Sequence, residues 1–197
     1  MPAERGAGGD RIYKNLDNYF NDCERCGQCC KLPGIFLPEQ VEALREQLDL
    51  GMETLFRRYL IAELFTPGCD LPPVFMLSPV KVDEAGKRLP KLFADGEYHR
   101  IRHRHCIFWH GAKAACRIYG NKPFGCSVLL CAKMTDSDPL LLRKSYYYQK
   151  WLDYQEILFR IFPHMEACME ELRPIAASGR KGVAEMTRAL NRSPSLV

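Results

Sequence analysis

The chain contains 197 residues, of which 47% are hydrophobic and 26% are charged, and its formal net charge is +4. This length predicts one domain with an extension, and the hydrophobic share is sufficient for a buried core. No apolar run approaches the length needed to span a bilayer, and so small a charge does not indicate nucleic-acid binding. Neither a membrane nor a nucleic acid is therefore an expected partner.

Residues 1–11 are predicted to form a disordered tail without a core. They lack the apolar stretch of a secretory signal, so we expect a cytoplasmic protein. Thiols stay reduced in the cytoplasm, and ten cysteines in this chain lie below the density of a disulfide scaffold. Cysteine patterns in such a protein indicate metal sites.

The densest feature of the chain is a group of four cysteines within eight residues: Cys23, Cys26, Cys29 and Cys30. Their intervals of three, three and one fit neither the period of a strand nor that of a helix face. Thiolates separated by two residues allow a tight loop to aim two sulfurs at one metal. The group therefore predicts metal ligation, and the alternatives are a disulfide knot or a patch of reactive thiols.

Two helices and an extended segment are predicted after this loop. Pro38 fits the first turn of a helix over 38–49, and a second helix is predicted over 52–65. Residues 74–83 are predicted to be extended, followed by a turn at Glu84–Lys87.

Residues 98–105 carry three arginines and three histidines in alternation, which predicts a strand with a basic face. The charges would either protect an exposed edge strand or offset the negative charge of thiolate-bound metal. In the second case Arg100, Arg102 and Arg104 would steer an acidic redox or protein partner. Four histidines flank the next cysteines and are assigned surface or supporting roles: His99, His103, His105 and His110.

A second cysteine group follows and raises the number of candidate thiolates to eight: Cys106, Cys116, Cys126 and Cys131. Eight thiolates match two four-coordinate sites or two cubane clusters. Cys106–Trp109 and Cys116–Tyr119 are predicted to pair as a hairpin that brings two of these cysteines together. The isolated Cys69 and Cys168 are assigned structural roles.

The C-terminal part is predicted to be helical. Pro139 suits the first turn of a helix over 139–162, and a shorter helix is predicted over 164–173. Aromatic and aliphatic residues recur at intervals of four and three along the first helix: Tyr147, Trp151, Tyr154, Leu158 and Ile161. This face would bind a partner or pack on its own domain, and the small number of repeats favours the second.

The predicted fold is α+β and mostly helical, with a small cysteine-rich metal-binding core, a short β-hairpin and a C-terminal helical extension. We expect the cysteine-cluster domain over 12–135, helices packed on it over 136–177 and a basic tail over 178–197.

The cysteine pattern resembles that of the YkgJ-like CxxCxxCC cysteine-cluster family of zinc- or iron-chelating domains. The resemblance covers about residues 20–131, somewhat over half of the chain, and departs mildly at Lys122, where the family more often has Arg. It rests on Cys23-x2-Cys26-Gly-x-Cys29-Cys30, Cys106, Cys116-Arg-Ile-Tyr119, Pro123 and Cys126. It implies a chelated metal, with zinc and iron–sulfur both proposed, and it implies no known reaction.

The spacing of the first three cysteines matches a ferredoxin run, although Cys30 follows at once and not after three residues. All-thiolate ligation suits both zinc and an iron–sulfur cluster, and the three evenly spaced thiols favour the cluster. Three functions remain open: an iron–sulfur protein with a redox or electron-transfer role, a zinc-stabilised structural or interaction domain, and a metalloenzyme of unknown substrate.

Overall fold

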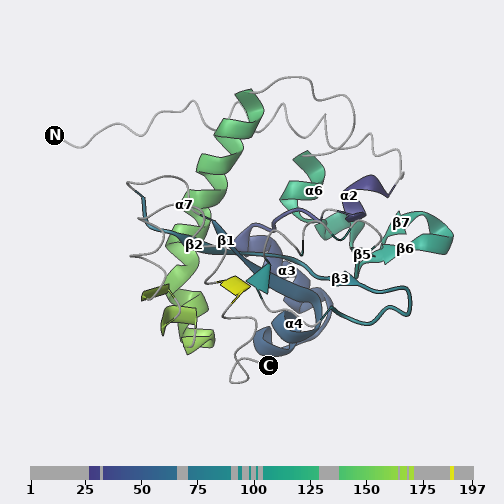
Figure 1. Cartoon of the computed structure of the whole chain (residues 1–197), viewed down its shortest axis with the longest axis horizontal. Coiled ribbons are helices and arrows are strands. Elements are labelled where there is room, and N and C mark those ends of the chain that lie inside the picture. Colours follow the sequence, from purple (N-terminus) through teal and green to yellow (C-terminus); the bar gives the residue numbers. More distant parts are fainter. Residues whose placement is uncertain are drawn as a thin grey trace.

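Figure 1 shows a computed structural model of the whole chain. The structure describes residues 27–31, 33–65, 71–89, 93–94, 98, 101, 104–128, 138–163, 165–167, 169–170 and 187–188. Helices and three small sheets share these residues, which confirms the mixed α+β class. No helix in this described part is long and apolar enough to cross a membrane.

The largest sheet has three strands in the order β2-β1-β4. Strand β1 (Leu60–Phe65) runs antiparallel to β2 (Val74–Pro79) over its full length and parallel to β4 (Phe93–Ala94). Every residue of β2 is buried. Both faces of β2 are therefore covered, and this strand lies in the interior of the protein.

The predicted helix over 52–65 is wrong in its second half. Helix α4 (Met52–Tyr59) ends at Tyr59, and Leu60 enters β1 directly with φ −117° and ψ 157°. The cause is the short, mostly apolar character of this stretch, which only Glu63 interrupts and which periodicity alone cannot assign to helix or strand. Pairing of all six residues with β2 decides in favour of the strand.

The other two long helices are confirmed as α3 (Pro38–Gln47) and α7 (Asp138–Ile161). Helix α7 packs against β2 and α3, as Figure 1 shows. Trp151 has no exposed surface, and its Nε1 donates a hydrogen bond of 2.9 Å to the Phe36 carbonyl. The aromatic face of α7 thus packs on the core of its own chain, as the sequence analysis favoured.

Gln155 of α7 completes the free edge of β2. Its Oε1 accepts a hydrogen bond of 2.9 Å from the Phe75 N–H, and its Nε2 donates one of 2.9 Å to the Phe75 carbonyl. β2 is an edge strand of the sheet, and an uncovered edge presents unpaired backbone groups. One buried side-chain amide therefore takes the place of a neighbouring strand at this residue.

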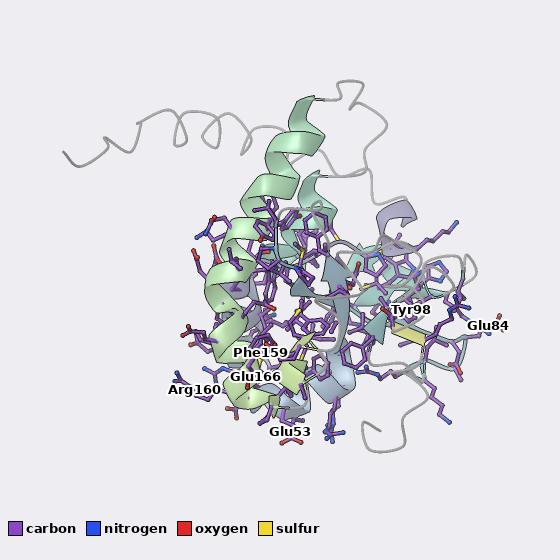
Figure 2. All side chains as sticks on the ribbon, turned by 60° about the vertical axis from the view of Figure 1, so that its left-hand side comes forward. Glu53, Glu84, Tyr98, Phe159, Arg160 and Glu166 are labelled. Atoms are coloured by element: carbon purple, nitrogen blue, oxygen red, sulfur yellow. The ribbon has the colours of Figure 1, made fainter. Side chains whose placement is uncertain are left out.

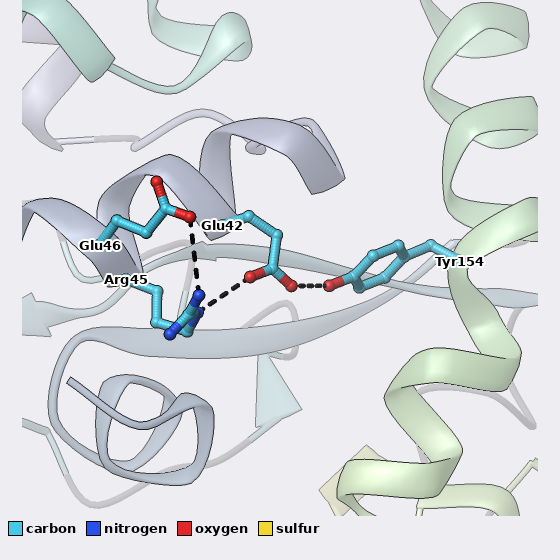
Figure 3. Close-up of polar contacts among 4 residues, drawn as sticks. All are labelled: Glu42, Arg45, Glu46 and Tyr154. Carbon is cyan, nitrogen blue, oxygen red and sulfur yellow. Dashed lines mark hydrogen bonds and ion pairs between the residues drawn. The ribbon is translucent and has the colours of Figure 1, made fainter. Parts of the chain in front are cut away.

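A polar contact also joins α3 and α7 (Figure 3). The Tyr154 hydroxyl donates a hydrogen bond to Glu42, whose other carboxylate oxygen accepts one of 2.9 Å from Arg45 Nε. Arg45 Nη2 also forms an ion pair with Glu46 Oε1, at 3.7 Å. Burial, followed by the hydrogen bond to Glu42, raises the pKa of Tyr154.

Residues 165–167 and 169–170 are helical, in agreement with the helix predicted over 164–173. Met165 and Met169 are buried in the same core as α7. Thr187 and Arg188 are the described residues of the predicted basic tail. The domain boundaries proposed from the sequence stay predictions.

Candidate metal centre

The structure describes four of the eight candidate thiol side chains: Cys30, Cys106, Cys116 and Cys126. No disulfide joins any two of these four. Cys29 belongs to a described helix, but its side chain lies outside the described residues. The remaining cysteines also lie outside them: Cys23, Cys26, Cys69, Cys131 and Cys168.

The two cysteine groups meet where a short helix lies against a strand. Helix α2 (Gln28–Lys31) contacts strand β5 (His105–Cys106), and Figure 1 shows α2 beside β5, β6 and β7. Cys30 and Cys106 are both buried and belong to one hydrophobic cluster. Segments about seventy-five residues apart in the chain are therefore neighbours in the fold.

A second contact between these segments involves Gly27 and Trp109. A Cβ atom built on Gly27 would lie 2.9 Å from the indole Cζ2 of Trp109, so glycine leaves just enough room for the ring. Trp109 is the direct cross-strand partner of Cys116. Paired residues of antiparallel strands project to the same face, so Cys116 lies on the hairpin face that meets Gly27, the residue after Cys26.

The hairpin itself is confirmed, but its strands differ from the predicted ones. Strands β6 (Trp109–His110) and β7 (Ala115–Cys116) pair around the 3-10 helix η1 (Gly111–Lys113). Cys106 belongs instead to β5, which pairs with β3 (Lys81–Val82). The chain turns at residues 107–108, so Cys106 lies before the turn and pairs with Lys81 of β3 and not with the second strand of the hairpin.

The strand predicted over 98–105 is also wrong at the described positions. Tyr98 is helical, Ile101 and Arg104 lie outside any strand, and His105 alone begins one. Tyr98 instead contacts Lys81: the Lys81 backbone N–H donates a hydrogen bond to the Tyr98 hydroxyl. Figure 2 shows Tyr98 within the body of the protein and Glu84 at its edge.

Lys81 is a buried cation opposite Cys106 in the β3–β5 pair. Its Nζ donates hydrogen bonds of 3.3 Å to the carbonyls of Tyr98 and Ile101. Burial lowers the pKa of Lys81, and the nearby charge of Glu63 opposes that shift.

Two of the described sulfurs accept hydrogen bonds from backbone N–H groups. Cys126 Sγ accepts one of 3.1 Å from Gly34, and Cys106 Sγ accepts a longer one of 3.5 Å from Phe108. Hydrogen bonds to sulfur are a recurring feature around thiolate-bound metals and adjust their properties. The donor set and its surroundings suit a thiophilic metal.

Among the described residues alone, no three His, Cys, Asp or Glu side chains gather closely enough to hold a metal ion. A centre that uses the described cysteines would have to draw further thiolates from Cys23, Cys26, Cys29 or Cys131. His105 and His110 are partly exposed. The His105 ring stacks against Trp109, with 6.4 Å between the ring centroids. His99 and His103 lie outside the described residues.

Basic residues surround the second cysteine group. No Asp or Glu occurs between Glu97 and Asp136, which is the sequence signal for this basic region. Lys113 and Arg117 are exposed on the hairpin and the turn after it. Arg104, in contrast, forms an ion pair with Glu84, with 3.4 Å between Nη1 and Oε1. Among the described residues, the exposed positive charge beside Cys116 thus comes from Lys113 and Arg117, whereas Arg100 and Arg102 lie outside the described residues.

Comparison with known families identifies the class of protein. Residues 22–144 match the family model described as "CxxCxxCC: Putative zinc- or iron-chelating domain". The match covers more than half of the chain, and the protein belongs to this family. Neither the curated proteins nor the solved structures gave a match.

Proposed function

We propose that this protein holds an iron–sulfur centre through its cysteine constellation and uses it for electron transfer in the cytoplasm. The family assignment supports chelation of zinc or iron. The observation that carries the proposal is the meeting of α2 and β5, which brings Cys30 and Cys106 into one buried region. The proposed ligands are the eight candidates: Cys23, Cys26, Cys29, Cys30, Cys106, Cys116, Cys126 and Cys131.

One feature favours iron–sulfur over zinc. The spacing of Cys23, Cys26 and Cys29 matches three ligands of a ferredoxin run. The N–H groups of Gly34 and Phe108 point at sulfur, which suits either metal, and around a cluster such hydrogen bonds would help to set the reduction potential. When bound, the cluster would accept and donate single electrons.

The test is a reduction titration of anaerobically purified protein, followed by visible spectroscopy. A brown protein whose absorbance bleaches on reduction and returns on oxidation would support the proposal. A colourless protein with stoichiometric zinc would overturn the redox role and favour a zinc-stabilised structural or interaction domain.

We further propose that an acidic redox partner binds at the hairpin. Lys113 and Arg117 are exposed beside Cys116, in a segment without any carboxylate side chain. Complementary charge would speed the encounter and make its rate fall with salt.

Ferricyanide, a small anionic oxidant, can stand in for the acidic partner in a rate measurement. The double substitution Lys113→Glu/Arg117→Glu should slow its oxidation of the reduced protein at low salt. Arg57→Glu/Arg58→Glu, two exposed changes on α4, alters the net charge by the same amount and serves as the control. Equal slowing in both variants would contradict a local docking surface.

A further inference from the structure

The segment that carries Cys126 is held by a glycine crossing. A Cβ atom on Gly34 would lie 2.3 Å from the Gly125 carbonyl carbon, and one on Gly125 would lie 2.6 Å from the Ile35 nitrogen. Two backbones can approach this closely only where both residues lack a side chain. The Gly125 N–H also donates a hydrogen bond of 3.0 Å to the Ile35 carbonyl. The chain just after the first cysteine group is thus locked to the residue before Cys126.

A single side chain, Gln40 of α3, clamps the same crossing from the other side. Its Oε1 accepts hydrogen bonds of 2.9 Å from the Phe124 N–H and 3.0 Å from the Leu37 N–H. Its Nε2 donates one of 3.0 Å to the Lys122 carbonyl. Gln40 therefore forms hydrogen bonds with both of the backbone segments that cross. Both polar atoms of its side chain, Oε1 and Nε2, take part.

The crossing has a consequence for the Cys126 sulfur. It places the Gly34 N–H 3.1 Å from Cys126 Sγ, although the two residues lie 92 positions apart. An N–H donor fixed in this way orients the sulfur toward one direction, as outer residues do for metal ligands.

We propose that Gln40, Gly34 and Gly125 are positioning residues, which orient Cys126 as a metal ligand. This inference rests on the proposed function, since it takes Cys126 to be a ligand. It assigns to Gln40 a role in metal affinity. The sequence does not suggest this role, because Gln40 lies on α3 and away from any cysteine.

Cobalt(II) is a suitable probe, because its thiolate complexes absorb visible light and a competing chelator measures its affinity. Outer residues that orient ligands typically change metal affinity about 10- to 100-fold. Gln40→Ala and Gly125→Ala should each weaken cobalt binding by about that factor and reduce the thiolate-to-cobalt absorbance. Cys126→Ser should do the same.

Two matched controls are a second glutamine of α3 and a second glycine close to Gly125 in the chain. Gln47, also on α3, accepts a hydrogen bond of 2.9 Å from Asn121 at an exposed position, and Gly120 has nothing within 4 Å of a built Cβ. Gln47→Ala and Gly120→Ala should keep the wild-type affinity and spectrum.

The double variant Gln40→Ala/Cys126→Ser separates positioning from general support of the fold. If Gln40 acts through Cys126, the double variant should bind cobalt as Cys126→Ser does, with no further loss. Additive losses in the double variant, or wild-type affinity in both Gln40→Ala and Gly125→Ala, would overturn the inference.

Hydrogen exchange of the metal-free protein tests the crossing independently of metal binding. The Gly34 amide should be protected in the wild type and exchange faster in Cys126→Ala and in Gln40→Ala. An unchanged exchange rate in both variants would overturn the inference. Failure of the wild type to bind cobalt would instead count against the proposed function, so the two failures can be told apart.

Discussion

Gly27 and Trp109 are in direct contact: a Cβ atom added to Gly27 would lie 2.9 Å from Cζ2 of the indole ring. Gly27 also has φ +73°, in the left-handed region that favours glycine. It follows Cys26 in the chain, whereas Trp109 pairs with Cys116. This contact therefore limits how closely Gly27, the residue after Cys26, can approach the hairpin.

Substitution of Gly27 should separate these two segments. Gly27→Ala combines a backbone cost of about 1–2 kcal/mol with a steric conflict against Trp109. We expect lower stability and less bound metal per chain. Gly86→Ala is the control, because Gly86 has φ +79° but nothing within 4 Å. Equal losses in the two variants would show that the Trp109 contact is unimportant.

Loss of a ligand should destabilise the metal-loaded protein far more than loss of a structural thiol. Structural metal sites can contribute roughly 10–16 kcal/mol of apparent binding energy to folding. Cys116→Ala should therefore lower the melting temperature much more than Cys168→Ala does. Identical melting temperatures for the two variants would argue against Cys116 as a ligand.

Gln155 should be essential to the edge of β2. Gln155→Leu preserves the size of the side chain but leaves the buried N–H and carbonyl of Phe75 without this partner. We expect a loss of about 2–4 kcal/mol in urea unfolding, since each unsatisfied buried group costs about 1–3 kcal/mol. Gln149→Leu, at an exposed site on the same helix, should change stability little.

Stability should fall at alkaline pH partly because of Tyr154. Its pKa is raised in the folded protein by burial and by the hydrogen bond to Glu42. The stabilisation is fully present below the pKa of an unfolded tyrosine, about 10, and is lost above it as the unfolded phenol ionises first. Urea midpoints measured from pH 8 to 11 should decline less steeply for Tyr154→Phe than for the wild type. Parallel declines would contradict this assignment.

The sequence predicted the fold best where one local signal dominated. Pro38 and the apolar spacing after it located α3, and the aromatic repeat through Trp151 located α7. The assignment failed at Leu60–Phe65 because this short, mostly apolar segment suits a helix or a strand, and its pairing with β2 decides between them.

The candidate site was predicted in part. Cysteine spacing identified the segments that meet, but not the residues that hold them together. Gly34, Gly125 and Gln40 act through contacts between residues more than eighty positions apart. Such contacts leave no periodic signal in the chain, and a glycine in a loop looks the same whether or not a second backbone crosses it.

The most direct test of the central claim is the content of iron, zinc and acid-labile sulfide per chain in anaerobically purified protein. The account predicts iron and sulfide in stoichiometric amounts, and a marked loss of both in Cys30→Ala and Cys106→Ala, which alter the two buried thiols where α2 meets β5. A protein without bound metal, or one whose metal content is unchanged in both variants, would contradict it.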